Sequence, residues 1–286
     1  MPLKVLMTGA NGRVGSAIRR HLGDDERYEW TYLDHSEHSG YEAVVGDVRD
    51  YDAIRPAFDG QDAVVHLALT AEGGGEFDPG APWGTSFSDE LEATCNVYGA
   101  AIDAGVEKMV YASSAQVISK HAGEWAIGHS HPDEYEEPDE RIAVDDPVRP
   151  NDLYGVTKAF GEDFGRFCHE AYGLRVYCIR IGWLLAADEN GIDHPYAAAE
   201  RGVREGHWER DSDEYEIETA DQKWLSHRDA ARLFDLCLRD ETVGFDVFHG
   251  ISDNEGRWLS IEHAREVLGY DPQDDVAEWD GPPESA

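Results

Sequence analysis

A tyrosine and a lysine stand four residues apart in the segment 153–162, which reads LYGVTKAFGE. On a helix this spacing places Tyr154 and Lys158 on the same face. Free tyrosine has a pKa of about 10, and a neighbouring ammonium group favours the phenolate. The pair therefore predicts a general base that removes a hydroxyl proton near neutral pH. The chain has only five lysines, which makes a lysine at this position more informative.

Glycines recur at every third position where the apolar run 4–8 gives way to a segment with helical periodicity. A sharp turn at Gly9, the approach of a pyrophosphate at Gly12 and close helix packing at Gly15 all favour a residue without a side chain. The free N–H groups at the start of the following helix would bind phosphate. The motif predicts a dinucleotide site. Its expected contacts are Gly9, Asn11, Gly12, Arg13, Val14 and Gly15.

Asp34 ends the second apolar run, where a carboxylate would accept hydrogen bonds from the ribose hydroxyls of adenosine. A 2′-phosphate would meet this negative charge, so NAD is expected in preference to NADP. Arg13 could pair with such a phosphate and weaken the preference. His66 could face the cofactor groove or be a core histidine. The other expected cofactor contacts are Asp47, Val48, Leu67, Ala68, Ile181 and the catalytic Tyr154 and Lys158.

Two serines, Ser113 and Ser114, end the fifth apolar run and would face the same cleft in a doubly wound sheet. We expect Ser114 to bind the substrate oxygen while the tyrosine moves the proton. The neighbouring Ala115 and Gln116 are also expected to contact the substrate. Asn96, inside a long predicted helix, either orients groups beneath the site or is an ordinary helical asparagine.

Apolar runs alternate with amphipathic segments along much of the chain. This alternation is typical of a parallel sheet with helices on both faces. Right-handed crossovers then give a doubly wound α/β fold of the Rossmann type. The expected strands are 4–8, 29–33, 42–45, 63–68, 108–112, 175–181 and 246–249. The expected helices begin near residue 12, cover 88–104, begin near residue 152, and cover 196–205, 228–239 and 261–268.

The chain is expected to divide into a cofactor-binding core and a smaller lobe. Residues 1–182 form the predicted Rossmann core, to which 224–250 return. Residues 183–286 are expected to form a substrate-binding lobe with an acidic tail, frayed after residue 279. The segment 123–150 is rich in acid, histidine and proline, and is expected to be a surface loop over the site.

Acidic residues outnumber basic ones by 60 to 24, which gives a formal net charge of −36. This charge argues against a nucleic-acid partner, because phosphate contacts need a basic face. It also destabilises the folded state by self-repulsion unless molar salt shortens the screening length to about 3 Å. The composition therefore predicts a halophilic source, and it reports habitat rather than activity.

No apolar stretch reaches the roughly 18 residues of a membrane-spanning helix, and the N-terminus lacks the pattern of a signal peptide. A cytoplasmic protein is expected. The cysteines have no CxxC spacing, so we expect free thiols in a reducing compartment, and metal binding is not indicated. These cysteines are Cys95, Cys168, Cys178 and Cys237.

These motifs resemble those of the extended short-chain dehydrogenases, the NAD-dependent epimerase/dehydratase superfamily. The resemblance rests on the three glycines, on YASSA at 111–115 and on the Tyr154/Lys158 pair. A narrower similarity is to uronate dehydrogenases and to the NAD-dependent glucose-6-phosphate dehydrogenases of halophilic archaea. It rests on LYGVTKAFGE at 153–162, RIG at 180–182, WLSHRD at 224–229, GISDN at 250–254 and LGYDPQD at 268–274.

The resemblance implies a catalytic set of Ser114, Tyr154 and Lys158, in which the lysine also holds the nicotinamide ribose. It implies oxidation of the anomeric carbon of a cyclic sugar to a lactone, with hydride transfer to NAD. Glucose 6-phosphate is the first expected substrate, and a hexuronate or a neutral aldose is the next. A small sugar is thus the expected partner, and a homodimer stays open as the assembly.

Two positions depart from these relatives. The relatives usually have asparagine after the serine pair, where this chain has Ala115, and arginine five residues before Trp224, where it has Thr219. Arginine suits bidentate recognition of carboxylate or phosphate, so the departures leave an uncharged sugar open. Thr219 and Arg228 are kept as expected substrate contacts. Other cations that could supply the charge are Arg201, Arg204, Arg210 and Lys223.

The main alternative is a nucleotide-sugar epimerase or dehydratase that keeps NAD tightly bound. Ala115 suits an epimerase, but the lobe after Lys158 is short for a nucleotide sugar. A dehydratase would need an acidic pair after the serine, where Ala115 and Gln116 stand. A redox-sensing or binding protein without catalysis is a third hypothesis, against which the intact catalytic set argues.

Overall fold

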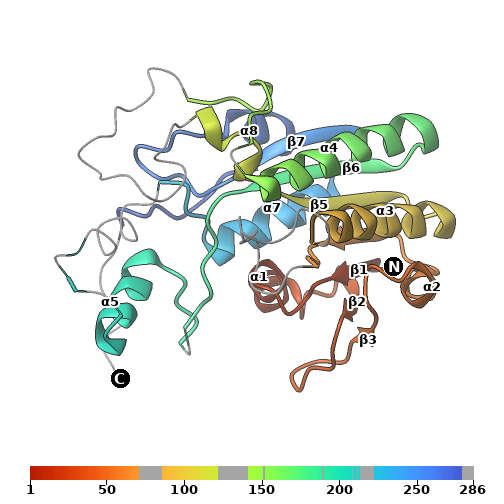
Figure 1. The fold of residues 1–286 in the computed structure, drawn as a ribbon, viewed down its shortest axis with the longest axis horizontal. Coiled ribbons are helices and arrows are strands. Elements are labelled where there is room, and N and C mark those ends of the chain that lie inside the picture. The colour runs from red at the N-terminus through yellow and green to blue at the C-terminus, as the bar shows by residue number, and fades with distance from the viewer. Residues whose placement is uncertain are drawn as a thin grey trace.

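The structure is a computed structural model that describes residues 1–70, 86–121, 141–150, 152–188, 190–207, 209–210, 212 and 222–278. In these ranges, seven parallel strands form one sheet in the order β3-β2-β1-β4-β5-β6-β7 (Figure 1). The order reverses between β1 and β4, and this confirms the expected doubly wound α/β fold. The strands are β1 Leu3–Thr8, β2 Tyr28–Asp34, β3 Val44–Val45, β4 Ala63–His66, β5 Lys108–Ser114, β6 Arg175–Ile181 and β7 Phe245–Gly250.

Helices cover both faces of the sheet. α1 (Arg13–Leu22) and α7 (His227–Arg239) pack together on one face. The other face carries α2 (Tyr51–Ile54), the 3₁₀ turn η1 (Arg55–Phe58), α3 (Ser86–Ala104) and α4 (Leu153–Tyr172). α5 (Pro195–Glu205) stands at the left of Figure 1, away from the sheet, and α8 (Glu262–Leu268) packs beside β7.

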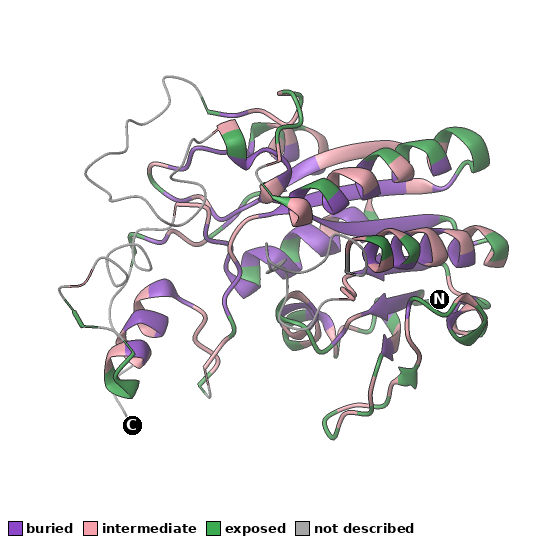
Figure 2. Ribbon diagram, viewed as in Figure 1, coloured by how far each residue is buried: buried purple, intermediate pink, exposed green. Residues whose placement is uncertain are grey.

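The central strands are buried on both faces, which explains their continuous apolar sequences. In β1, Val5 and Met7 belong to the core beneath α1 and α7, whereas Leu6 belongs to the core beneath α2, α3 and α4. This alternation follows from the two-residue period of a strand. Figure 2 shows the buried residues gathered on the strands and on the inner sides of the helices.

The expected strands and long helices are confirmed, with ends that differ by a few residues. β4 ends at His66 instead of residue 68, because Leu67 and Ala68 turn to donate their N–H groups to Thr8. β3 has only two residues, both exposed. The short helices α2 and η1 were not predicted, since four residues are too few to display a helical period.

Chain segments beyond residue 182 pack back onto the first part. β7 pairs with β6, and α7 packs against α1. The described end of the predicted loop, 141–150, lies along 258–260 through hydrogen bonds between Ile142 and its partners Trp258 and Ser260. The remainder of that loop, 123–140, and the tail from 279 lie outside the described residues. In the described ranges no helix combines the length and apolarity that a membrane crossing requires.

Candidate active site

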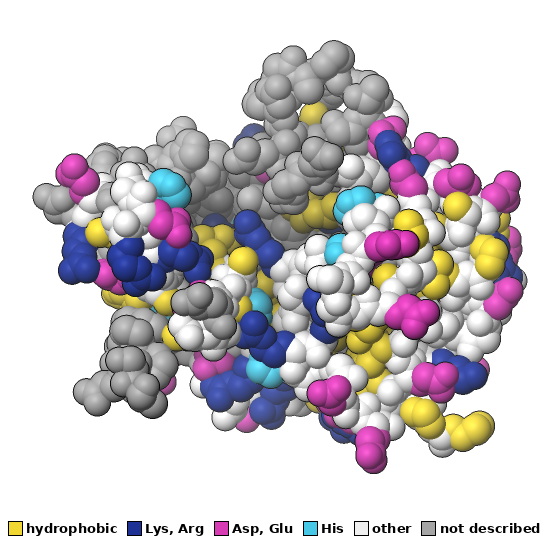
Figure 3. Space-filling view, turned by 90° about the horizontal axis from the view of Figure 1, so that it is seen from below, with side chains coloured by type: hydrophobic (Ala, Val, Ile, Leu, Met, Phe, Trp, Pro, Cys, Tyr) yellow, Lys and Arg dark blue, Asp and Glu magenta, His cyan; other side chains and the backbone are white. Residues whose placement is uncertain are grey.

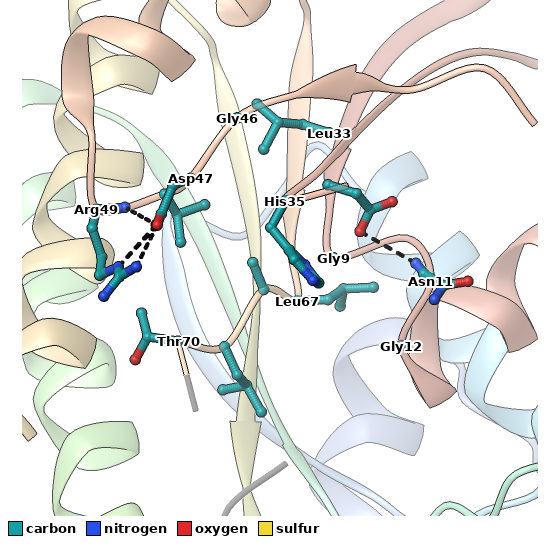
Figure 4. Close-up of a pocket in the computed structure, with 14 residues that line it drawn as sticks. Gly9, Asn11, Gly12, Leu33, His35, Gly46, Asp47, Arg49, Leu67 and Thr70 are labelled. Carbon is teal, nitrogen blue, oxygen red and sulfur yellow. Dashed lines mark hydrogen bonds and ion pairs between the residues drawn. The ribbon is translucent and has the colours of Figure 1, made fainter. Parts of the chain in front are cut away.

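A pocket of about 420 Å³ opens at the carboxyl ends of β1, β2 and β4, next to the start of α1 (Figure 4). This is the point at which the strand order reverses, where open α/β sheets bind ligands. Its lining residues are Gly9, Asn11, Gly12, Leu33, Asp34, His35, Gly46, Asp47, Val48, Arg49, Leu67, Ala68, Leu69 and Thr70.

The glycine motif forms the floor of this pocket. Gly9 has φ +72°, and a Cβ there would lie 2.7 Å from the backbone of Ala68. A Cβ on Gly15 would lie 2.5 Å from the carbonyl oxygen of Ala10, so the helix packs closely as predicted. No side chain caps the N-terminus of α1, and its first N–H groups are therefore available to an anion. These features fit a dinucleotide pyrophosphate.

The first turn of α1 follows directly after this floor. Arg13, Val14 and Gly15 begin the helix but are not among the described residues that line the pocket. Arg13 is exposed. A direct contact of its guanidinium with a ribose phosphate therefore stays a prediction.

Asp34 is buried in the wall of the pocket at the end of β2. One carboxylate oxygen lies 3.5 Å from the Asn11 N–H (Figure 4), and the other accepts a hydrogen bond of 2.7 Å from the Tyr41 hydroxyl. His38 lies 3.7 Å from the same carboxylate. Burial and the bond to Asp34 raise the pKa of Tyr41, so Tyr41 stays a donor. The carboxylate is thus held at the position expected for binding a ribose.

The opposite wall is formed by the turn after β3. Asp47 accepts hydrogen bonds from the side chain of Arg49, and these lower the pKa of Asp47. The buried Val48 lines the pocket beside them. Asn96 donates to the carbonyl oxygens of Val48 and Arg49 at 3.1 and 2.9 Å. Asn96 therefore orients the backbone of this wall.

His66 is a buried core residue. Its Nδ1 lies 2.9 Å from the hydroxyl of Thr8, which also receives the N–H groups of Leu67 and Ala68. Burial, together with the charge of Lys158, lowers the pKa of His66 to about 3. The imidazole is neutral, and it helps to shape the pocket through its contact with Thr8.

Lys158 is buried on the inner face of α4, where three side chains lie close to its ammonium. The ammonium lies 5.1 Å from the ring centre of Tyr111, 5.6 Å from that of Tyr154 and 3.5 Å from a carboxylate oxygen of Glu90. Burial lowers the pKa of Lys158, but its interactions with Tyr111, Tyr154 and Glu90 outweigh burial and raise it above the ordinary value. Lys158 is therefore a fixed cation beside the Tyr154 ring.

The two serines of β5 have different environments. Ser113 donates a hydrogen bond of 2.5 Å to the buried carboxylate of Glu162. Ser114 caps the 3₁₀ turn η2 (Ala115–Val117), where its hydroxyl oxygen accepts the N–H of Gln116 at 3.2 Å. Ser114 also pairs in register with Ile181, at the carboxyl end of β6. The Ser113 hydroxyl is used inside the fold, and Ser114 keeps a hydroxyl hydrogen to donate.

Close packing brings the first turn of α4 against η2. Asp152 caps α4 by accepting the N–H of Gly155 at 2.6 Å. A Cβ on Gly155 would lie 2.5 Å from the carbonyl oxygen of Gln116 and 2.9 Å from Pro150. The missing side chain thus allows Tyr154 to approach the turn that begins at Ser114.

Replacing Gly155 by alanine should therefore move the start of α4 and destabilise the protein by about 1–3 kcal/mol. The displacement should also lower kcat, because Tyr154 lies on the displaced turn. Urea unfolding and steady-state kinetics in molar KCl would measure both effects. Gly99→Ala is the matched control, since a Cβ there meets only Tyr51 at 3.7 Å. Equal stability and kcat for the two variants would contradict the packing argument.

The expected substrate contacts have different surroundings. Ala115 is buried, and the Gln116 side-chain oxygen is buried without a hydrogen-bond donor among the described residues. Thr219 lies outside the described residues. Arg228 is exposed and pairs with Asp274, so its expected substrate contact is not among the interactions found for it. The structure places Ser114 and Gln116 at the carboxyl end of β5, whereas Arg228 lies on α7.

The other candidate cations lie on or near α5 and at the end of β6. Arg201 and Arg204 lie on α5, and Arg210 pairs with Glu200. Lys223 precedes the bridge between Trp183 and Trp224. Basic side chains gather at the left of Figure 3, the end of the molecule that carries α5, whereas acidic side chains dominate the right.

Sequence reasoning missed several residues around the expected catalytic set. Glu90 reaches Lys158 from α3, and Thr70 in the pocket wall donates to Glu90. Tyr111 packs on Lys158, and Gly161 makes room for its hydroxyl. Glycine spacing in α4 was a usable signal for close packing. Glu90, one of 60 acidic residues, gave none.

Comparisons with known proteins agree with this geometry. The family described as the NAD dependent epimerase/dehydratase family matches residues 5–247. The NAD-dependent glucose-6-phosphate dehydrogenase of Haloferax volcanii is 37% identical over 289 residues, 98% of this chain and 96% of that protein. The L-arabinose 1-dehydrogenase (NAD(P)(+)) of the same organism is 34% identical, over 96% of this chain and 98% of that protein. Among solved structures, glucuronic acid dehydrogenase from Chromohalobacter salexigens is 27% identical with a TM-score of 0.70, over 96% of this chain and 86% of that one.

Proposed function

This chain belongs to the NAD-dependent epimerase/dehydratase family, and from that membership we propose that it oxidises the anomeric carbon of a cyclic sugar to a lactone. It is an NAD-dependent oxidoreductase that acts on a CH–OH group, like the sugar dehydrogenases to which it is similar. One observation carries the proposal. The Tyr154/Lys158 pair and Ser114 belong to the same sheet edge as a dinucleotide pocket.

NAD fits the pocket by the chemistry of its walls. The uncapped N-terminus of α1 suits the pyrophosphate, and the buried carboxylate of Asp34 suits the adenosine ribose. Lys158 would hold the ribose next to the nicotinamide ring. Bound NAD would supply the hydride acceptor. We propose residues 1–182, with 224–250, as the unit that binds it, and 183–286 as the substrate lobe.

The chain's own residues account for the proton. Tyr154 removes the proton of the substrate hydroxyl as the adjacent carbon–hydrogen bond breaks, so the sugar loses a proton and a hydride and becomes a lactone. Ser114 donates a hydrogen bond to the reacting oxygen. Lys158 stabilises the negative charge on Tyr154.

Glucose 6-phosphate is the first substrate to test. The 37% identical relative acts on it by name, and the arginines of α5 could supply cations for its phosphate. L-Arabinose, a hexuronate and other aldoses follow, because other relatives are named for arabinose and uronate. The net charge of −36 and the Haloferax relatives favour activity in the cytoplasm of a salt-accumulating cell.

The purified protein in molar KCl should reduce added NAD with one member of this sugar panel. Release of NADH is followed by absorbance, and the lactone by its alkaline hydrolysis to the acid. Conversion of a nucleotide sugar without net NADH, while all free sugars fail, would replace the proposal by a nucleotide-sugar epimerase.

Replacing Asp34 by alanine should weaken NAD binding about tenfold, because hydrogen bonds to a charged group contribute about 1.5–3 kcal/mol. The same change should improve NADP relative to NAD, since the charge that repels a 2′-phosphate is gone. KM values for both cofactors measure the effect. Glu37→Gln, an exposed acid of the same loop, is the control. An unchanged NAD/NADP ratio would show that Asp34 does not set the preference.

A further inference from the structure

A buried carboxylate faces the ammonium of Lys158 from the neighbouring helix α3. The side chains of Glu90 and Lys158 are only 6% and 4% exposed, and Glu90 Oε1 lies 3.5 Å from Lys158 Nζ. The other oxygen, Oε2, accepts two hydrogen bonds of 2.9 Å from Thr70, one from its N–H and one from its hydroxyl. The two oxygens of one carboxylate therefore join the wall of the cofactor pocket to the catalytic lysine.

Glu90 is the only charged partner of Lys158 among the described groups that face it. Tyr111 on β5 faces the ammonium, but burial raises the pKa of Tyr111 and keeps it neutral. His66 on β4 is neutral because burial lowers its pKa. The ring centre of Tyr154 on α4 lies 5.6 Å from the ammonium, and in the proposed mechanism this side chain becomes negative only as the base. With Tyr154 protonated, the carboxylate of Glu90 alone balances the buried ammonium.

An unbalanced ammonium would not keep its charge at this depth. Moving a lone cation out of water costs several kcal/mol, and buried lysines lose their proton instead. Lys158 must be charged to stabilise the phenolate of Tyr154. A carboxylate held in place by Thr70 supplies this charge balance before any substrate binds, and it fixes the position of the ammonium.

We propose that Glu90 is a positioning residue for catalysis, which keeps Lys158 charged and in place and thereby sets the pH range of the reaction. The inference rests on the proposed function of the site and extends it to a residue that contacts neither substrate nor cofactor in the proposed mechanism. Glu90 acts through Lys158, and Thr70 ties it to the pocket that the cofactor would occupy.

Glu90→Gln removes the charge and keeps the shape of the side chain. Loss of a negative charge makes proton release easier for every group that faces it. The acid limb of the kcat profile, where Tyr154 gains its proton, should move to lower pH. Lys158 should also lose its proton at a lower pH than in the parent protein. We expect both shifts to be about one pH unit.

Two further variants make the test specific. Glu90→Asp keeps the charge and should return the profile towards its original position. Glu92→Gln makes the same charge change at an exposed position on α3. In molar KCl the screening length is about 3 Å, so this control should leave the profile unchanged. A profile that stays in place in Glu90→Gln, with only Tm lowered, would make Glu90 merely structural and overturn the proposal.

A second measurement needs no substrate. Tyrosinate absorbance is recorded against pH for the protein and for Glu90→Gln. Each curve is corrected by subtracting that of the same protein carrying Tyr154→Phe. The step that depends on Tyr154 should occur about one pH unit lower in Glu90→Gln. If no sugar is oxidised but this step moves, the sugar assignment fails and the role of Glu90 stands. If sugars are oxidised but neither the profile nor the step moves, the role of Glu90 fails.

Discussion

Tyr154→Phe should lower kcat for sugar oxidation about a thousandfold, which is within the usual contribution of a positioned general base. The phenyl ring keeps the packing of Lys158, whose ammonium lies 5.6 Å from the ring centre. Only the oxygen that removes the substrate proton is lost. Binding of NAD should change little, because the pocket walls belong to β1, β2 and β4 and to the segments that follow them.

Two measurements separate catalysis from binding in this variant. Steady-state kinetics give kcat, and titration of NADH fluorescence gives Kd for the cofactor. Tyr172→Phe is the control, since Tyr172 ends the same helix and is 60% exposed. Activity of Tyr154→Phe within tenfold of the parent protein would exclude Tyr154 as the base and would point to another proton acceptor.

The fold could be predicted because its main elements leave regular patterns in the sequence. Strands buried on both faces must be continuously apolar, and the glycine motif after β1 marks the point where the sheet order reverses. The pairing of Tyr154 with Lys158 was also local, since one helical turn separates them. Structural features that depend on local periodicity or on short spacings can therefore be predicted from a single sequence.

Contacts between distant segments leave no such pattern in the sequence. Glu90 and Lys158 are 68 positions apart, and α3 and α4 must pack before the two meet. We expect Ser114 rather than Ser113 to bind the substrate oxygen, but the hydrogen bond that engages Ser113 with Glu162 is again a contact between distant segments. Thr219, an expected substrate contact, lies outside the described residues. Prediction was weakest where side chains from several elements converge.

Glu162 fixes the position of α4 relative to the strands β5 and β6. Its carboxylate forms a bidentate pair with Arg180 at 2.9 and 2.8 Å and accepts the hydroxyl of Ser113. The Glu162 and Arg180 side chains are only 6% and 3% exposed. Arg180 also donates to the carbonyl of Val144 at 3.0 Å. The pair therefore fixes α4, which carries Tyr154 and Lys158, against β5, which carries Ser114.

Glu162→Ala should destabilise the protein by about 3–5 kcal/mol, because it leaves Arg180 as a buried cation without its partner. The double variant Glu162→Leu/Arg180→Met removes both charges and should regain part of the loss. The recovery should be incomplete, since the hydrogen bonds of Ser113 and Val144 are also gone. Urea unfolding in molar KCl gives the free energies, with the slope checked for an unchanged unfolded state.

The adjacent Asp163 gives the matched control, since it is exposed on the same helix and differs from Glu162 mainly in burial. Asp163→Ala should change stability by less than about 0.5 kcal/mol, as surface substitutions usually do. If the charges of Glu162 and Arg180 contributed no more than a surface ion pair, the two variants would be equally stable. If Glu162→Ala came within about 1 kcal/mol of Asp163→Ala, the pair could not be what sets α4 against β5. The position of Tyr154 beside Ser114 would then depend on the close contact at Gly155 instead.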